Sequence, residues 1–327
     1  MSRTAFVTGG TGFIGLNLVE LLVEKGWNVT ALQRRTSDLT YLKQFPVSLV
    51  KGDITNYDDI KNAIPRGTDV VFHVAGSTNM WSERNAEQTA INIEGTRNML
   101  NAALQQNVGT FIYTSSVAAW GHATGLITEQ EPQLGDESWV NYQYTKWAAE
   151  QEVLKAGHQD MKVVILEPSS VSGPYDMNNW GRIVIALNKG ELPGVPKGFI
   201  NVTHVREVVR AHLNAVDMGN HGERYLLTGD ERTFEEFIVS IANASEISDI
   251  PRTVPAPILS LMAKIEVLKS KFTGKPPRLT PEMVDLSTRT DVTYACDKAK
   301  KQLDYKIIPM EQTVRDCHAW LKRENFI

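Results

Sequence analysis

The chain has 327 residues, a formal net charge of −4, and ordinary hydrophobic and charged fractions of 42% and 22%. This composition is typical of a globular protein with a large core, and it excludes the strongly basic surface of a nucleic-acid-binding protein. Two cysteines, Cys296 and Cys317, are too few for a disulfide framework or a metal set. We therefore expect free thiols, no metal, no nucleic-acid partner and a cytoplasmic location.

Neither export nor a membrane span is expected. The first predicted strand begins almost at the N-terminus, with no charged region followed by a long apolar run, so no secretory signal is expected. No apolar run approaches the about 20 residues that a helix needs to cross a bilayer.

A glycine-rich stretch at residues 8–15 reads Thr-Gly-Gly-Thr-Gly-Phe-Ile-Gly, between a predicted strand and a predicted helix. Gly9 permits a tight turn, Gly12 lets the backbone approach a phosphate, and Gly15 lets the helix lie against the strand. The amides at the helix start, at Phe13 and Ile14, then face a pyrophosphate whose charge the helix dipole favours. The stretch predicts a dinucleotide site; a structural turn without a ligand is the alternative.

Strands and helices alternate as far as residue 168. Strands are predicted at 4–7, 27–32, 46–51, 69–74, 110–114 and 162–166, and helices at 56–64, 83–106 and 141–154. The run at 69–74 is almost wholly apolar, as in a strand that is buried on both faces. The alternation predicts an α/β fold with a doubly wound parallel sheet and right-handed crossovers.

The chain changes character after Gly173, where prolines and glycines become frequent. A helix at 206–216 and a strand at 224–227 precede a mainly helical region, with helices at 233–244, 256–271, 280–287 and 310–323. We predict a dinucleotide-binding domain at 1–173, to which 198–229 returns. Residues 174–197 and 230–327 would form a smaller, mainly helical substrate-binding region over the carboxyl edge of the sheet, where ligands bind.

The predicted helix at 256–271 is amphipathic. Its apolar residues recur on one face, namely Ile258, Leu261, Met262, Ile265 and Leu268. We expect this face to pack on the protein's own core; contact with a membrane or a partner is the alternative.

Two polar groups follow the fifth predicted strand. Tyr142 and Lys146 are four residues apart, so they share a helix face. A nearby ammonium group favours the phenolate and lowers the pKa of the tyrosine, which makes it a usable proton donor and acceptor. Hydroxyls at the strand end, Ser115 and Ser116, can hydrogen-bond a substrate oxygen. The alternatives without a catalytic role are a surface tyrosine–lysine pair and a serine that caps a turn.

Taken together, these residues resemble the extended short-chain dehydrogenase/reductase family, also called the NAD-dependent epimerase/dehydratase superfamily. The resemblance covers most of the chain, is densest over 1–175, and lies nearest the dihydroflavonol 4-reductase and 3β-hydroxysteroid dehydrogenase branch. It rests on the glycine-rich stretch, Gly52-Asp53-Ile54, His73-Val74-Ala75-Gly76, Ser116, Tyr142, Lys146, 167–174 and 276–281. It implies a Rossmann fold.

The resemblance also assigns roles. Tyr142 would be the acid/base, Lys146 would hold the nicotinamide ribose and tune the tyrosine, and Ser116, rather than Ser115, would bind the substrate carbonyl. Asn92 would steady the neighbouring backbone. The resemblance implies further cofactor contacts. Asp53 and Ile54 would lie beside the adenine, and Val74, Ala75 and Gly76 would lie beneath the cofactor. The segment from Pro168 to Val171 would line the nicotinamide.

The end of the second predicted strand indicates which cofactor binds. An acid about 20 residues after the glycines would bind the ribose 2′-hydroxyl of NAD, but the sequence here is Gln33-Arg34-Arg35. Arginine can pair with a 2′-phosphate through a charge-assisted fork. We therefore favour NADPH, with NAD(H) as the alternative, in which Arg34 and Arg35 are merely solvated.

Two positions depart from the family pattern. Glu167 stands where an arginine often precedes the proline, and Glu207 stands where an aspartate is common. Both departures concern the loops on the substrate side. The substrate pocket would be built from aromatic and apolar segments, namely Met80-Trp81, Trp120, Trp139, 175–180 and 190–200.

These observations predict an NADPH-dependent reductase of a ketone or aldehyde on a small, largely apolar or aromatic substrate, reversibly an alcohol dehydrogenase. The alternatives are a nucleotide-sugar epimerase or dehydratase that retains its cofactor, and a non-catalytic redox sensor. For the former, Arg182, Arg206 and Arg210 are the available diphosphate ligands. A homodimer through helices near 84–106 and 141–155 is plausible from the resemblance.

Overall fold

A computed structural model describes residues 2–157 and 161–327. Seven parallel strands form its main sheet, in the order β11-β7-β5-β4-β1-β2-β3. The strands are β1 (Thr4–Thr8), β2 (Asn28–Gln33), β3 (Ser48–Lys51), β4 (Val70–His73), β5 (Thr110–Thr114), β7 (Lys162–Pro168) and β11 (Glu223–Leu227). This arrangement confirms the predicted doubly wound parallel sheet.

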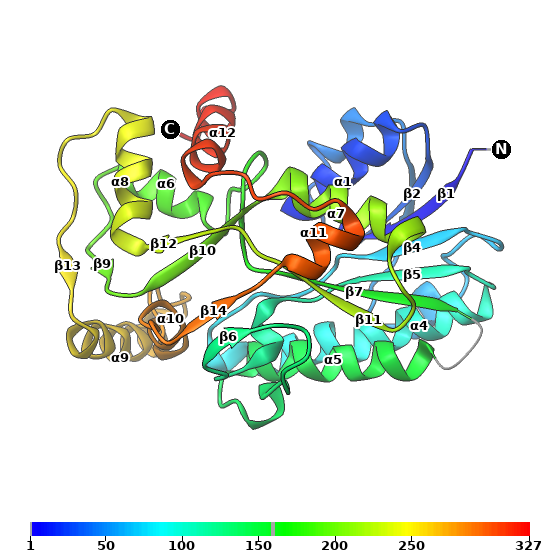
Figure 1. The fold of residues 1–327 in the computed structure, drawn as a ribbon, viewed down its shortest axis with the longest axis horizontal. Coiled ribbons are helices and arrows are strands. Elements are labelled where there is room, and N and C mark those ends of the chain that lie inside the picture. Colours follow the sequence, from blue (N-terminus) through cyan, green and yellow to red (C-terminus); the bar gives the residue numbers. More distant parts are fainter. Residues whose placement is uncertain (1, 158–160) are drawn as a thin grey trace.

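Helices cover both faces of the main sheet (Figure 1). One face carries α1 (Phe13–Glu24) and α7 (Val205–Met218), and the other carries α4 (Gly95–Gln105) and α5 (Asn141–Gly157). The alternation along β1 explains the two cores, because Ala5 and Val7 join the cluster on the first face while Phe6 joins the cluster on the second.

The predicted helix at 83–106 is divided. It consists of α3 (Asn85–Thr89), a π-helical turn (Ala90–Glu94) and α4. Such π turns are frequent at functional sites, and this one carries Asn92. The predicted helix at 56–64 is only one turn, α2 (Tyr57–Ile60), whose expected cap is confirmed because Asn56 accepts the amide of Asp58 at 3.1 Å.

The remaining segments form a second lobe, at the left of Figure 1. Its small sheet has the order β12-β10-β8. The elements are β8 (Ser170–Ser172), α6 (Gly181–Asn188), β9 (Val195–Pro196), β10 (Phe199–His204), β12 (Asp230–Thr233), α8 (Phe234–Ser245), β13 (Thr253–Val254), α9 (Ala256–Thr273), α10 (Pro281–Ser287) and α12 (Met310–Arg323). Sequence reasoning missed its strands and α6, because short strands are specified by distant partners rather than by their own pattern.

Further short elements complete the chain. They are β6 (Gly125–Ile127), which pairs with β14 (Val292–Tyr294), α11 (Asp297–Leu303), and the 3₁₀ turns Leu42–Gln44, Ser82–Arg84, Val117–Trp120 and Gly135–Glu137. Within 198–229, α7 and β11 belong to the main sheet unit, whereas β10 pairs in the small sheet. The domain boundaries themselves stay a prediction.

The expectation that the apolar face of the helix at 256–271 packs on the protein's own core is wrong. The apolar stripe of α9 does not pack on the core: Ile258, Leu261, Ile265 and Leu268 are exposed, and Met262 is half-buried. The opposite face of α9 packs inward instead, through Leu259 and Ala263. No helix in the described part of the chain is both long enough and apolar enough to cross a membrane. Both cysteines are free and buried, as expected.

Candidate active site

The glycine-rich stretch forms a tight cradle between β1 and α1. Gly9 has a φ of +70°, and a Cβ there would lie 2.7 Å from the backbone nitrogen of Ala75. A Cβ at Gly15 would lie 2.0 Å from the carbonyl oxygen of Gly9. Gly12 is the exposed N-cap of α1, with no side-chain cap and no acid in the first turn. The helix start, including Phe13 and Ile14, therefore fits a pyrophosphate group.

A buried hydrogen-bond chain ties this cradle to the π turn. The Ala75 amide donates to the Thr8 hydroxyl at 3.1 Å, and that hydroxyl lies 2.8 Å from His73 Nδ1. His73 Nε2 then donates to the Thr96 hydroxyl at 3.0 Å, which donates to the Asn92 carbonyl at 2.7 Å. Burial and the charge of a nearby lysine lower the pKa of His73 to about 3, so the ring is neutral, as this chain requires.

Asn92 holds the backbone that follows β4. Its side-chain oxygen accepts the Ser77 amide at 2.7 Å, and its amide group donates to the Ser77 carbonyl and to the Thr145 hydroxyl, each at 3.0 Å. A Cβ at Gly76 would lie 3.4 Å from both the Asn92 oxygen and Lys146 Nζ. These contacts support the backbone-steadying role of Asn92 and place the loop at 74–77 beside α5.

The three predicted catalytic side chains converge at the end of β5. Tyr142 and Lys146 lie one turn apart on α5, and the Ser116 hydroxyl lies near enough to the Tyr142 phenol to lower its pKa. Lys146 Nζ donates to the carbonyl of Thr114 at 2.9 Å and lies 5.3 Å from the ring centre of Tyr113. Ser116 also caps the turn that follows it. The structure thus brings the serine, the tyrosine and the lysine to one place.

The charges at this place differ from expectation in one respect. Burial raises the pKa of Tyr142, and the neighbouring Ser116 hydroxyl opposes that rise. Lys146 does not lower the pKa of Tyr142 as expected; its ammonium group donates to a backbone carbonyl and lies over an aromatic ring. Burial lowers the pKa of Lys146 to about 8, and the neighbouring Glu150 opposes that change. The phenol is therefore protonated at neutral pH.

A buried pair of carboxyl groups lies beside these residues, and sequence reasoning did not identify it. Glu150 of α5 and Glu167 of β7 are both fully buried. Gln133 Nε2 donates to Glu150 at 2.7 Å and to Glu167 at 3.0 Å. The Ser115 hydroxyl also donates to Glu150, and Trp120 Nε1 donates to Glu167 at 3.2 Å. With its hydroxyl occupied by Glu150, Ser115 is less available than Ser116 to a substrate.

One cation faces this pair. The Arg224 guanidinium lies 3.9 Å from a Glu150 oxygen and 5.6 Å from the ring centre of Trp120. Burial and the charge of Glu150 raise the pKa of Glu167 well above its usual range. Burial also raises the pKa of Glu150, and the charge of Arg224 opposes that rise. The pair therefore holds a proton in common, which the more strongly raised pKa of Glu167 favours at Glu167, and Glu150 is the member that faces Arg224. The sequence showed Glu167 only as a departure from the family pattern.

The predicted adenosine end of the site is open. Arg34 and Arg35 follow β2 and are exposed, and within the described residues neither forms an ion pair. Asp53 is half-buried and accepts the amide and hydroxyl of Thr55 at 2.9 and 2.8 Å. Ile54 is buried, and its side chain fills the space that a Cβ at position 95 would need. Both arginines are thus free to bind a phosphate.

The opposite end, along the predicted nicotinamide, is built by the segment after β7. Pro168 and Val171 are buried, and Ser169 between them donates to Asn201 Oδ1 at 2.7 Å. Val74 and Ala75 are half-buried at the end of β4, and Gly76 is exposed. The predicted cofactor residues therefore line the carboxyl edge of the main sheet; that they bind cofactor stays a prediction.

A small hollow lies beside Tyr142. It is lined by Asn79, Met80, Asn85, Gln88, Val140, Asn141, Tyr142 and Glu282. The side-chain amides of this lining are bonded to one another and to the loop at Asn79. Asn141 donates to Gln88 at 2.8 Å, and Gln88 donates to the Asn79 carbonyl at 2.7 Å. Glu282 of α10 is a lining residue that sequence reasoning missed, because only the tertiary fold brings α10 to α5.

Of the expected aromatic pocket residues, several lie elsewhere. Trp120 is fully buried among core residues, and Tyr175 packs against Trp320 with ring centres 5.2 Å apart. Trp139 is 57% exposed. Only Met80 borders the hollow. The small hollow beside the tyrosine is therefore not built by the aromatic residues that were expected to line the substrate pocket.

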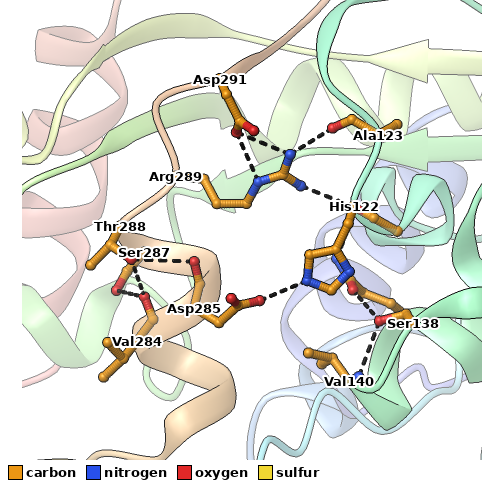
Figure 2. A network of polar contacts seen from close by, with 12 residues as sticks. His122, Ala123, Ser138, Val140, Val284, Asp285, Ser287, Thr288, Arg289 and Asp291 are labelled. Carbon is orange, nitrogen blue, oxygen red and sulfur yellow. Dashed lines mark hydrogen bonds and ion pairs between the residues drawn. The ribbon is translucent and has the colours of Figure 1, made fainter. Parts of the chain in front are cut away.

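The second lobe is fastened to the loop that follows Ser116. His122 Nε2 lies 2.8 Å from Asp285 of α10, and Figure 2 shows the two side chains meeting between their elements. Arg289 donates to the carbonyls of Gly121 and Ala123 at 3.2 and 2.6 Å. These contacts fix α10 over the hollow beside Tyr142.

Sequence comparison places the chain in a family. Residues 5–227 match the NAD dependent epimerase/dehydratase family, and the chain belongs to it. A Synechocystis protein named as a candidate dihydroflavonol 4-reductase is 30% identical, covering 100% of this chain and 97% of that protein. The sterol demethylase protein B of Methylococcus capsulatus is 28% identical, covering 99% and 100%. The 3-beta-hydroxysteroid dehydrogenase of Mycolicibacterium neoaurum is 27% identical, covering 95% and 89%.

Solved structures agree with the fold. The crystal structure of gox2253 is similar over 100% of both chains, with a TM-score of 0.84 and 28% identity. Bordetella bronchiseptica WbmH, solved in complex with NAD+, is similar over 100% of both chains, with a TM-score of 0.78 and 21% identity, which shows the fold alone. The predicted family is confirmed, and the chain is an NAD(P)-dependent oxidoreductase that acts on alcohol or carbonyl groups.

Proposed function

We propose that this protein is an NADPH-dependent reductase of a ketone or aldehyde on a small, largely apolar or aromatic substrate, and reversibly an alcohol dehydrogenase. The observation that carries the proposal is the convergence of Ser116, Tyr142 and Lys146 at the end of β5, next to the glycine cradle. The names of the relatives support it, since they include a reductase and a dehydrogenase.

The chain's own residues would act on the carbonyl oxygen. NADPH, when bound, supplies the hydride that reduces the carbonyl carbon. Ser116 would hydrogen-bond the oxygen, and Tyr142, which is protonated at neutral pH, would donate its proton to the developing alkoxide. Lys146 would hold the nicotinamide ribose in place, and solvent would restore the proton to Tyr142. In the reverse direction the phenolate would accept the proton of the alcohol.

Arg34 and Arg35 support the choice of NADPH. Both are exposed at the end of β2, where an acid would otherwise bind the 2′-hydroxyl of NAD. A phosphate dianion there would gain charge-assisted hydrogen bonds from guanidinium groups that have no competing carboxylate among the described residues.

The sugar-nucleotide alternative has less support. A diphosphate needs a cluster of free cations, but Arg210 is engaged by Glu207 at 3.0 Å and by Asp304 at 3.5 Å. Arg206 is exposed at the start of α7, and Arg182 is the remaining candidate. Tight binding of uridine diphosphate with a retained oxidised cofactor would favour the alternative over the proposal.

The proposal is tested with Tyr142→Phe. A screen of carbonyl compounds that follows NADPH absorbance, with NADH in parallel, identifies a substrate for the wild type. The variant keeps its NADPH affinity and loses about a hundredfold or more in kcat, because it lacks the proton donor. Tyr144→Phe, on the exposed face of the same helix, is the control and keeps its kcat. Near-normal turnover by Tyr142→Phe would show that the role assignment is wrong.

A further inference from the structure

The outer face of α9 is an apolar stripe that the protein itself does not cover. Five large apolar side chains on it are 45% to 84% exposed, namely Ile258, Leu261, Ile265, Leu268 and Phe272. They recur at intervals of three and four residues, so they lie on one side of the helix. The inner face already provides the packing, since Leu259 and Ala263 are buried against Val284 of α10.

This stripe differs from the other exposed apolar residues. It runs from Ile258 to Phe272, a length of about 21 Å at the rise of an α-helix. The other large apolar side chains that are exposed in the described part of the chain stand on separate elements rather than in a row. Isolated residues of that kind need no explanation, whereas a contiguous row marks an interaction surface.

The charges around the stripe indicate which partner it fits. Lys264, Lys271 and Lys275 are exposed, and none of them lies within ion-pair distance of an acid among the described residues. The one acid of the helix, Glu266, is paired with Lys269 at 2.9 Å. The chain as a whole has a net charge of −4, so this basic surplus is local.

The acids of the neighbouring α10 do not neutralise this surplus. Asp285 is engaged by His122, and Glu282 lines the hollow beside Tyr142. Two copies of α9 laid stripe to stripe would bring like charges together, which disfavours self-association. An anionic bilayer accepts both features, because the apolar stripe enters the acyl boundary while the lysines meet the headgroups.

We propose that α9 is an interfacial helix that docks the protein on an anionic phospholipid membrane through the stripe from Ile258 to Phe272. Figure 1 shows α9 and α10 together at one end of the molecule, with the main sheet toward the other end. Because α10 packs on α9 and lines the hollow beside Tyr142, docking would bring that side of the catalytic site near the bilayer. The inference does not depend on which carbonyl compound is reduced.

The test is co-sedimentation of the full-length protein with vesicles of phosphatidylcholine and phosphatidylglycerol. The wild type binds these vesicles, and binds pure phosphatidylcholine vesicles and high-salt samples more weakly. The double variant Leu261→Ser/Phe272→Ser binds more than about tenfold more weakly, since it removes apolar area that the bilayer would bury. Met218→Ser is the matched control, because Met218 is 47% exposed at the end of α7 and its loss leaves binding unchanged.

Circular dichroism spectra and melting temperatures equal to those of the wild type confirm that the double variant is folded. Failure of the wild type to bind anionic vesicles, or equal binding by the double variant, overturns the proposal. Equal binding to pure phosphatidylcholine overturns the role of the lysines. Light scattering that shows a dimer, abolished by the double variant and unaccompanied by vesicle binding, assigns the stripe to a second copy of the chain instead. Each result is independent of turnover, so it leaves the proposed reductase activity separately testable.

Discussion

Replacing Glu167 with glutamine removes a buried group that can ionise and keeps its shape. In the native protein Glu167 is protonated, because burial and the Glu150 carboxylate both raise its pKa. In the unfolded chain a glutamate has a pKa of about 4.3. Stability from this group is therefore fully present below about pH 4.3 and is lost as the pH rises through the higher pKa of the folded state. Glutamine does not ionise, so the variant does not lose stability in this way as the pH rises.

The size of the effect follows from proton linkage. Between the two pKa values, unfolding releases one proton from Glu167, so its contribution to the free energy of unfolding falls by about 1.4 kcal/mol per pH unit. Over two pH units inside that window, Glu167→Gln should gain about 2.7 kcal/mol relative to the wild type. The amide can still accept from Trp120 and can donate to Glu150, so the local hydrogen bonds largely survive.

The assay is urea unfolding of both proteins at a series of pH values from 5 to 8, with the difference in free energy of unfolding plotted against pH. The difference should rise with pH for Glu167→Gln and stay flat for the control Glu137→Gln, whose side chain is exposed. Parallel curves for the wild type and Glu167→Gln across this range would refute the assignment of the shared proton to Glu167.

Three further outcomes are expected. Replacing Arg34 and Arg35 together with serine should raise the KM for NADPH about tenfold or more and leave the KM for NADH nearly unchanged, as measured by steady-state kinetics with both cofactors; equal effects on the two would contradict 2′-phosphate binding. Gly15→Ala should abolish cofactor binding in titration calorimetry, because its Cβ would lie 2.0 Å from a carbonyl oxygen, whereas Gly109→Ala, whose nearest neighbour is at 3.4 Å, should bind normally. Since the pKa of Lys146 is lowered to about 8, kcat/KM should fall above pH 8. A folded and active Lys146→Arg variant stays charged, so its pH profile of kcat/KM should lack that fall. A pH profile of the variant equal to that of the wild type would contradict the role of the ammonium group.

Local patterns predicted the elements that hold the site. The strand at 110–114 and the start of the helix at 141 coincide with β5 and α5, because buried parallel strands and long helices are specified by their own periodicity. The glycine spacing predicted the cradle, because Gly9 and Gly15 answer a local steric need: a Cβ at either position would lie within 3 Å of backbone atoms. The shared helix face of Tyr142 and Lys146 followed from the same elements, whereas the choice of Ser116 and the three roles came from the family resemblance.

Features built from distant segments were not predictable in this way. The cluster around Glu150 and Glu167 joins α5, β7 and a loop, and no spacing within one segment reports that meeting. The stripe on α9 was predicted as amphipathic, but periodicity does not say which face is covered, and small residues such as Ala263 proved sufficient for the inner contact.

The sequence by itself determined a parallel dinucleotide-binding sheet, the glycine cradle and the residues at the end of β5, because these depend on interactions among neighbours along the chain. The tertiary structure alone decided the charges. It surrounded the phenol of Tyr142 with protein that raises its pKa further, turned Lys146 toward a backbone carbonyl, and paired Glu167 with Glu150. A pKa depends on the solvent that is excluded and on the charges that are brought near, and both are properties of the folded molecule.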